Sequence, residues 1–289
     1  MQSILEYVKG AREQSKAVGH FNVATLDMLW AVINSARELG VPVVIGASEG
    51  ERDFMGASTL RAIITEYCDR TGEPIYLNAD HTYSFERAKE VIDLGYDSLV
   101  VDGAKLSWDE NVALTKRVVE YAESVKSNII VEGELGYIGQ SSKVLDSIPD
   151  GANLDDDTLT TVEQAVSFVE QTGVKMLAPA IGSMHGMLRA GHNPDLNIKR
   201  IGEIRSAVST PLVLHGGSGL TDENFKQGIT AGISLVHVST ELRVAWTKAL
   251  TLALQESPDE VAPYKILKSA RTTVEKVVAE KLKLFNNIA

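Results

Sequence analysis

The chain has 289 residues, of which 44% are hydrophobic and 23% are charged, a composition typical of a soluble globular protein. Its formal net charge of -11 argues against broad binding to nucleic acid or to an anionic membrane surface. A single cysteine excludes an intramolecular disulfide framework, and no stretch approaches the roughly 18 apolar residues of a membrane span. We therefore expect a soluble, cytoplasmic protein without a nucleic-acid or membrane partner.

Eight short apolar runs recur along the chain, with helical patterns between them. The runs are nearly continuously apolar, as buried parallel strands are, and they span residues 17–23, 41–48, 74–80, 97–103, 128–136, 176–182, 211–217 and 234–240. The stretches between them carry apolar residues at the i, i+3, i+4, i+7 spacing of amphipathic helices. Glycine repeatedly closes these helices just before the next run.

This alternation predicts one α/β domain over residues 1–289, folded as a single (β/α)8 TIM barrel. An open, doubly wound sheet is the alternative, and the absence of a GxGxxG motif after the first run counts against it. One longer connection, residues 140–160, is polar, acidic and rich in turn formers. We expect it to form a surface loop near the mouth of the barrel.

Histidines and carboxylates gather where the predicted strands end. In a parallel barrel the C-terminal strand ends carry the catalytic groups, and four of the six histidines fall there. The titratable residues at these ends are Asp80, His81, Asp102, Glu132, Glu134, His185, His215 and His237. Three neutral imidazoles with one open position are the ligand set of a catalytic Zn²⁺ or a similar ion. The alternative for each single histidine is a hydrogen-bonded side chain inside the barrel.

The run HGGSG, residues 215–219, follows the seventh predicted strand. Glycines let the backbone approach an anion closely, and N–H groups at a helix start favour phosphate. The loops after strands 7 and 8 are the usual phosphate site of such barrels. HGGSG alone could be a tight turn, but together with VST at residues 238–240 it favours a phosphate site.

Taken together, these segments resemble the class II, metal-dependent ketose-bisphosphate aldolases, the fructose- and tagatose-bisphosphate aldolase family. The resemblance covers essentially the whole chain. It rests on ADH (79–81), VVDGAKLSWDENV (100–112), VEGELGYIG (131–139), TGVKMLAPAIGSMHG (172–186) and VLHGGSG (213–219). The resemblance implies that His81, His185 and His215 bind Zn²⁺ or another divalent cation and that Asp80 is the proton donor.

The resemblance also implies the remaining site residues. Asp102 and Glu134 can hold a second or displaced metal ion. The substrate-binding positions are Asn22, Ser48, Gly186, Gly216, Gly217, Ser218, His237, Ser239 and Thr240. The dihydroxyacetone phosphate part of the substrate is sometimes bound there together with a monovalent cation, Na⁺ or K⁺. For Ser48, stabilisation of a turn is an equally weighted alternative.

The implied reaction is reversible cleavage of a ketose bisphosphate, by default fructose 1,6-bisphosphate, to dihydroxyacetone phosphate and glyceraldehyde 3-phosphate. Two alternatives keep this chemistry, with tagatose 1,6-bisphosphate or with a ketose 1-phosphate that lacks the distal phosphate. A third alternative is a non-catalytic barrel that binds sugar phosphates. Because relatives are usually dimers or tetramers, the resemblance implies a homodimer or homotetramer.

Two departures from the family pattern that matter for the substrate lie after the fifth strand and near the C-terminus. Gln140 replaces a glycine in the run after the fifth strand, and an acidic pair is missing there. Tyr264 stands where fructose-bisphosphate enzymes have an arginine for the distal phosphate, and tyrosine cannot give bidentate, charge-assisted recognition. Arg189, Arg243 or an arginine of a neighbouring subunit could replace it.

Two further departures place unusual histidines in the first and eighth strands. Family members usually have asparagine at the position of His237, and alanine is common at the position of His20. These strands are neighbours when a barrel closes, and alternation turns His20 inward if Asn22 points inward. We therefore predict that His20 and His237 lie close together as a hydrogen-bonded pair. The alternative is two independent, space-filling changes.

Overall fold

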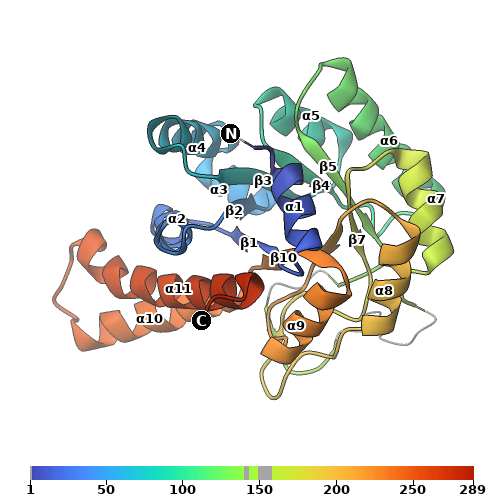
Figure 1. The fold of residues 1–289 in the computed structure, drawn as a ribbon. Helices are drawn as coiled ribbons and strands as arrows, with labels where there is room; N and C mark the ends of the chain where they lie inside the picture. The colour runs from blue at the N-terminus through green and yellow to red at the C-terminus, as the bar shows by residue number, and fades with distance from the viewer. Residues whose placement is uncertain (1, 140–142, 149–157) are drawn as a thin grey trace.

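The computed structural model describes residues 2–139, 143–148 and 158–289, and it confirms the predicted barrel. Eight parallel strands close in the order β1-β10-β9-β7-β5-β4-β3-β2 (Figure 1). They are β1 (Val18–Asn22), β2 (Val43–Ala47), β3 (Ile75–Thr82), β4 (Ser98–Val101), β5 (Ile130–Leu135), β7 (Met176–Pro179), β9 (Leu212–Leu214) and β10 (Ile233–Val238). Each predicted apolar run overlaps one of these strands, although β3 runs on past residue 80 and β10 begins one residue before its run.

Helices surround the strands on the outside of the barrel (Figure 1). They are α2 (Leu26–Leu39), α3 (Glu49–Met55), α4 (Ala57–Thr71), α5 (Phe85–Asp93), α6 (Trp108–Ser124), α7 (Val162–Thr172), α8 (Ile198–Ala207), α9 (Asp222–Ala231), α10 (Thr240–Glu256) and α11 (Pro263–Asn286). Local chemistry sets several ends. Ser107 begins α6 with a capping box, and Gly40 ends α2 in the left-handed conformation at φ 64°.

The end of the barrel opposite the predicted site is closed by α1 (Ile4–Glu13) (Figure 1). Its buried residues Ile4 and Val8 pack against apolar side chains that fill the bottom of the barrel, among them Val18, Val44 and Leu235. A larger apolar cluster packs the helices onto the strands. Both clusters bury apolar surface and hold the strands rigidly, which fixes the positions of side chains at the other end.

The barrel interior changes from apolar to polar toward its mouth. Alternate residues of a strand point to the same face, and on β3 these are Tyr76, Asn78 and Asp80. Tyr76 belongs to the apolar cluster at the bottom, Asn78 is fully buried in the middle, and Asp80 lines a pocket at the mouth. The strand pattern therefore stacks a polar site on an apolar base.

The predicted loop at residues 140–160 is described only in part. Within it, the short strand β6 (Val144–Leu145) pairs in parallel with β8 (Met187–Leu188), and the two form a small second sheet. Gln140 lies outside the described residues. Near the C-terminus, α10 and α11 form a helical hairpin that packs against α2 through α11 and projects from the body (red in Figure 1). No helix in the described part of the chain is long and apolar enough to cross a membrane.

Candidate active site

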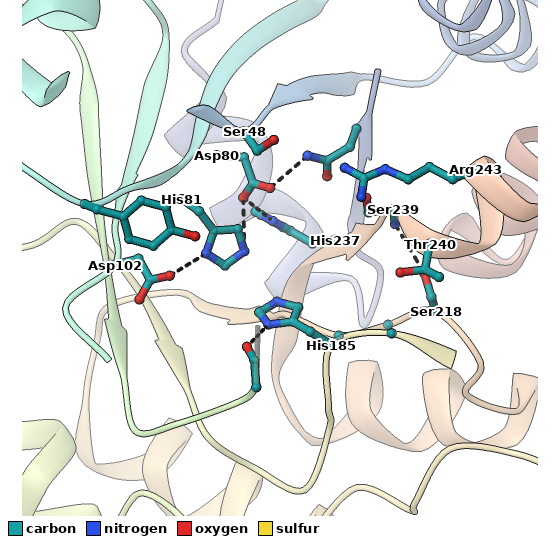
Figure 2. Close-up of a pocket in the computed structure, with 16 residues that line it drawn as sticks. Ser48, Asp80, His81, Asp102, His185, Ser218, His237, Ser239, Thr240 and Arg243 are labelled. Atoms are coloured by element: carbon teal, nitrogen blue, oxygen red, sulfur yellow. Dashed lines mark hydrogen bonds and ion pairs between the residues drawn. The ribbon is translucent and has the colours of Figure 1, made fainter. Parts of the chain in front are cut away.

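Asp80 and His81 are neighbours in sequence, yet both line the pocket at the barrel mouth (Figure 2). In a regular strand, adjacent side chains point to opposite faces. His81 departs from strand geometry with a φ of 42°, and the register of β3 against β4 shifts between Ala79 and Thr82. A left-handed conformation costs a non-glycine residue about 1–2 kcal/mol, and such strain is concentrated at functional sites. This kink turns both side chains into one pocket.

A buried arginine holds this kink in place. Arg52, on α3, is only 1% exposed. Its Nη1 donates to the carbonyl oxygens of Ala47 at 2.6 Å and Asp80 at 3.0 Å. Its Nη2 donates to the Thr82 hydroxyl at 3.2 Å. Arg52 therefore binds the chain on both sides of His81 and ties the ends of β2 and β3 together.

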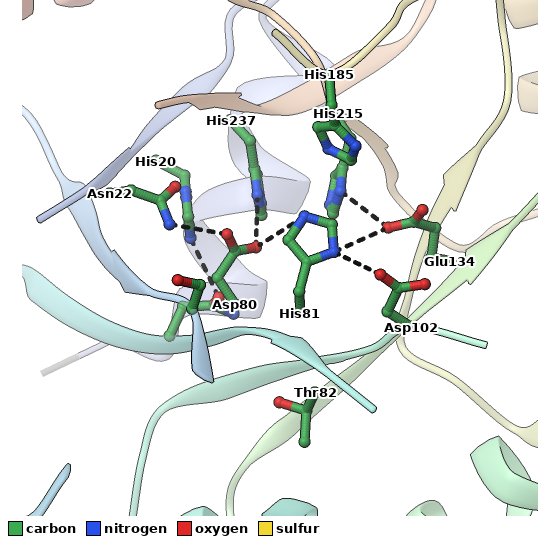
Figure 3. Close-up of polar contacts among 12 residues, drawn as sticks. His20, Asn22, Asp80, His81, Thr82, Asp102, Glu134, His185, His215 and His237 are labelled. Carbon is green, nitrogen blue, oxygen red and sulfur yellow. Dashed lines mark hydrogen bonds and ion pairs between the residues drawn. The ribbon is translucent and has the colours of Figure 1, made fainter. Parts of the chain in front are cut away.

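Three histidines from different strands converge at the mouth of the barrel (Figure 3). His81 lies on β3, His185 follows β7 and His215 follows β9. Each offers one ring nitrogen, and these nitrogens all lie within 4.8 Å of one another. Such a spacing suits a single ion bound by all three rings, because zinc–nitrogen bonds are about 2.0–2.1 Å long. The structure thus brings together the three histidines predicted as ligands.

The second nitrogen of each ring is held by an oxygen of the protein. The pairs are His81 Nδ1 with Asp102 Oδ2 at 2.8 Å, His185 Nδ1 with the Gly139 carbonyl oxygen at 2.5 Å, and His215 Nε2 with Glu132 Oε1 at 2.8 Å. Histidines that bind metals are oriented in this way. The free nitrogen of His215, Nδ1, is buried without a hydrogen bond to any described residue, although Glu134 Oε2 lies 3.2 Å away.

Buried carboxylates give this region a field that favours a cation. They are Asp80, Asp102, Glu132 and Glu134. Burial alone lowers the pKa of His81, but the neighbouring carboxylates, Asp80 foremost, raise it to about 9. Burial likewise lowers the pKa of His215, and Glu132 and Glu134 bring it well above its usual value. A field that stabilises a proton on these rings also stabilises a divalent ion between them, so the residues present fit the ion.

Replacing Glu132 with glutamine should weaken the binding of Zn²⁺ by about 10–100-fold, the usual effect of losing a carboxylate behind a histidine ligand. Glutamine keeps the shape of the side chain but removes the charge that orients His215. Competition with a chromogenic chelator measures the affinity. Glu170→Gln, on the exposed face of α7, is the matched control. An unchanged affinity in the Glu132 variant would contradict this role.

On the other side of the pocket, two loops present small residues and a helix start. Ser218 accepts hydrogen bonds from the backbone N–H groups of Ser239 and Glu241, both at 3.2 Å, at the N-terminus of α10. A Cβ added at Gly216 would lie 2.5 Å from the Met184 carbonyl oxygen, and its φ is 67°, so only glycine fits there. Helix starts and glycine loops of this kind favour phosphate groups.

The predicted site residues collect around this one pocket (Figure 2). The pocket is lined by Asn22, Ser48, Asp80, His81, Asp102, His185, Gly186, Gly216, Gly217, Ser218, His237, Ser239 and Thr240, and also by Tyr83, Gly139 and Arg243. Glu134 and His215 are buried beside it, each 1% exposed. All residues predicted for the site therefore lie together.

Sequence reasoning gave no role to several residues that shape the site. The sequence marks Glu132 only as a strand-end residue, although it lies two positions before Glu134 and therefore shares its face of β5. Arg52 carried no signal, because it lies in a helix. Tyr83 carried none either. Glu51 accepts hydrogen bonds from Asn22 Nδ2 at 3.0 Å and from Arg243 Nη2 at 2.6 Å.

The two histidines that depart from the family pattern, His20 and His237, do lie together as predicted. Strand pairing sets them opposite each other, and their ring centroids are 3.5 Å apart with planes 4° from parallel. The predicted hydrogen bond between them is wrong, because parallel rings at this spacing stack face to face. Instead, His20 Nε2 lies 3.1 Å from Asn78 Oδ1. Burial lowers the pKa of His20 to about 4, so the ring is neutral near pH 7.

A parallel barrel with a three-histidine cluster, an adjacent acid and a glycine-rich helix start defines a barrel enzyme equipped for a metal ion and a phosphorylated substrate. The family model described as "Fructose-bisphosphate aldolase class-II" matches residues 2–288. The chain belongs to this family. It is a metal-dependent aldolase, a carbon–carbon lyase that acts on phosphorylated sugars.

Individual relatives agree with this membership. A fructose-bisphosphate aldolase of Staphylococcus aureus (strain Mu50) is 34% identical over 286 residues, covering 98% of this chain and 96% of the relative. The crystal structure of the YdjI aldolase from Escherichia coli K12 matches with a TM-score of 0.81 at 31% identity, covering 98% and 96% of the two chains. A fructose-bisphosphate aldolase from Campylobacter jejuni shares the fold, with a TM-score of 0.78 at 19% identity over 98% and 93%.

Proposed function

We propose that the protein reversibly cleaves a ketose 1,6-bisphosphate, by default fructose 1,6-bisphosphate, to dihydroxyacetone phosphate and glyceraldehyde 3-phosphate. The observation that carries this proposal is the convergence of His81, His185 and His215 beside Asp80, in the same pocket as the Gly216–Ser218 loop. Metal ligands, an acid and a phosphate-type loop are the parts that this reaction needs.

His81, His185 and His215 are the proposed ligands of the divalent ion, and Asp102 and Glu134 are proposed for a second or displaced ion. Zn²⁺ is the proposed metal because three imidazoles with an open position are its common catalytic ligand set. When bound, the ion supplies Lewis-acid polarisation of the substrate carbonyl, which spreads the negative charge that develops as the bond between C3 and C4 breaks.

Asp80 is the proposed acid and base at the C4 oxygen. In cleavage it takes the proton of the C4 hydroxyl while the electron pair of the C3–C4 bond stays with the dihydroxyacetone half, and in synthesis it returns that proton. Burial raises the pKa of Asp80, but His81 and His237 hold it well below its usual value. Asn22 Nδ2 donates to Asp80 Oδ2 at 2.8 Å and orients the carboxylate.

Substrate phosphate at C1 is proposed to bind at Gly216, Gly217 and Ser218 together with Ser239 and Thr240. Of the cations suggested for the distal phosphate, Arg243 is the one that lines the pocket. Arg189 is two-thirds exposed and pairs with Asp146, and Tyr264 is 77% exposed on a separate apolar groove. We therefore assign the distal phosphate to Arg243.

Replacing Arg243 with glutamine should raise KM for the bisphosphate by about 10–100-fold, the worth of one charge-assisted hydrogen bond. Turnover of the corresponding 1-phosphate should change less than about twofold, because it lacks the group that Arg243 binds. Steady-state kinetics on both sugars give the comparison, and Arg189→Gln is the control. An equal loss of kcat/KM on the two sugars would show that Arg243 does not bind the distal phosphate.

The proposed function is tested by offering the zinc-loaded protein the fructose and tagatose 1,6-bisphosphates and the two ketose 1-phosphates. Coupled reduction of dihydroxyacetone phosphate scores cleavage. We expect the highest kcat/KM on a bisphosphate, with fructose 1,6-bisphosphate as the default. A preference for a 1-phosphate would establish the alternative without a distal phosphate, and no release from any sugar would contradict the proposed function.

We also propose that residues 1–289 act as one domain and assemble into a homodimer or homotetramer, as the family resemblance implies. Large apolar side chains on and near the helical hairpin support this, because Phe54, Val261 and Tyr264 are each at least 77% exposed. Light scattering of the zinc-loaded protein measures the assembly. A monomer at micromolar concentration would contradict it.

A further inference from the structure

Three imidazole rings stack across three neighbouring strands of the barrel. His237, on β10, lies between the other two (Figure 3). Its centroid is 3.5 Å from that of His20 and 4.2 Å from that of His215, with planes 4° and 24° from parallel. His20 and His237 are directly paired in the strand register. The plane of the His237 ring is therefore fixed from both sides.

The residues around His20 hold its ring in one orientation. A Cβ added at Gly46, on the adjacent β2, would lie 2.1 Å from His20 Cε1, so a glycine is needed there. His20 Nε2 lies 3.1 Å from Asn78 Oδ1, and Asn78 in turn donates to the Ser98 hydroxyl at 2.8 Å. With the space filled and one edge bonded, His20 forms a rigid backing for His237.

The edge of His237 is left available to a ligand. The residue is 6% exposed and lines the pocket, and neither ring nitrogen makes a hydrogen bond to a described residue. Leaving a buried polar group unsatisfied costs about 1–3 kcal/mol, so such a group in a pocket calls for a partner. Its Nδ1 lies 3.4 Å from Asp80 Oδ1. Nδ1 therefore faces the carboxylate that acts at C4, and Nε2 is the nitrogen left for a ligand.

We propose that His237 discriminates between the two configurations of the substrate at C4 by contacting the C4 oxygen. We also propose that His20 is a positioning residue that holds the His237 ring for this contact. The inference rests on the proposed function, because it takes Asp80 as the group that exchanges a proton with the C4 oxygen. Fructose and tagatose bisphosphates differ only in the direction of that oxygen. A group beside Asp80 meets the C4 oxygen of the two sugars differently.

The stack explains why a ring can discriminate where an amide is more tolerant. An asparagine, usual in the family at this position, ends in an amide with a broad torsional preference, so its polar atoms can follow a hydroxyl out of any one plane. An imidazole clamped between two rings directs its nitrogens along fixed lines in one plane. A hydroxyl that points toward such a nitrogen is bound, and its epimer leaves the nitrogen unsatisfied.

Four proteins test the proposal: the wild type, His20→Ala, His237→Asn and the double variant. The readout is the ratio of kcat/KM for fructose and tagatose 1,6-bisphosphates, which a loss of folded protein would not alter. We expect each single substitution to move this ratio toward one by about tenfold, the worth of one hydrogen bond. Because His20 acts through His237, His20→Ala should change the ratio less than about twofold in the His237→Asn background.

Two further variants separate positioning from packing. His20→Phe keeps a flat ring against His237 but loses the contact with Asn78, so it should restore most of the wild-type ratio. Met176→Ala opens a cavity in the apolar bottom of the same barrel and should leave the ratio unchanged. A ratio unaffected by His237→Asn would overturn the assignment of His237. Effects of His20→Ala that are equal in both backgrounds would overturn the role of His20.

Failure of the proposed function is recognised separately. If the zinc-loaded wild type cleaves neither epimer, the proposed function is wrong, and so is the proposed discrimination at C4. Denaturant unfolding of the same four proteins then tests whether His20 and His237 stabilise the fold as a stacked pair. Stacked rings predict that the double variant loses less midpoint stability than the sum of the single losses. Additive losses would show that the two histidines are independent and would overturn the pair.

Discussion

Replacing Asp80 with asparagine should lower kcat for ketose bisphosphate cleavage by about 10²–10⁴-fold, the usual contribution of a positioned acid or base. The amide keeps the shape of the carboxylate and still accepts from Asn22, whose Nδ2 lies 2.8 Å from Oδ2. It cannot take the proton of the C4 hydroxyl. Steady-state release of dihydroxyacetone phosphate measures kcat, while KM and bound zinc should stay within a few-fold of the wild type.

An exposed carboxylate provides the control for this substitution. Asp93, at the end of α5, pairs with Lys89 on the surface, and Asp93→Asn should leave kcat unchanged. Zinc content measured by mass spectrometry shows whether a loss of turnover in the Asp80 variant comes from lost metal. A kcat within about twofold of the wild type would exclude Asp80 as the acid and base. Loss of zinc along with kcat would assign it to the metal site instead.

Replacing His185 with alanine should reduce cleavage to background and abolish the stabilisation that added zinc gives. An ion that binds only the folded state stabilises it by about 2.7 kcal/mol at a hundredfold excess over its Kd. His185 offers one of the three converging nitrogens, and its Nδ1 is already held by the Gly139 carbonyl oxygen. Its removal leaves two ligands and a gap, so both activity and the zinc-dependent rise in Tm should disappear.

His192 is an exposed loop histidine seven residues along the chain, and His192→Ala is the matched control. It should keep the full activity and the full rise in Tm on addition of zinc. Thermal unfolding with and without one equivalent of zinc per chain gives the comparison. A His185 variant that is still stabilised by zinc to the wild-type extent would show that the ion binds elsewhere.

The barrel was predictable from the sequence because its strands are buried on both faces. Such strands are continuously apolar, and every one of the eight apolar runs overlaps an observed strand. Most of the runs are longer than their strands. The run at 211–217, for example, contains only Leu212–Leu214, because the loop residues that follow are also small or buried. The pairing of β6 with β8 gave no signal, since two-residue strands are too short to show alternation.

The residues that make up the site were also predictable, but the backbone kink and the contacts that position them were not. Strand ends located the histidines and carboxylates, because every strand of a parallel barrel ends at the same face. The left-handed kink at His81 and its support by Arg52 depend on contacts between residues far apart in sequence. Similarly, Arg243 could be proposed as a cation but not placed, because its position depends on how α10 begins.

His20 and His237 mark the limit of such reasoning. Barrel closure and alternation predicted that the two rings would meet, and they do. Whether two imidazoles bond edge to edge or stack depends on the space around them. Here, Gly46 opens a seat beneath His20 and Asn78 binds its edge, which leaves a face toward His237. Neither residue is close to His20 in the sequence, so the stacking became visible only in three dimensions.

The most direct test of a three-histidine, metal-dependent aldolase is removal and return of the metal. Purified protein is treated with a strong chelator, freed of it, and assayed with fructose 1,6-bisphosphate as zinc is added back in steps. We expect release of dihydroxyacetone phosphate to vanish on chelation and to be restored in proportion to zinc until the site is filled. The His185→Ala variant should not recover at any zinc concentration. Undiminished turnover after removal of the metal would contradict the central claim.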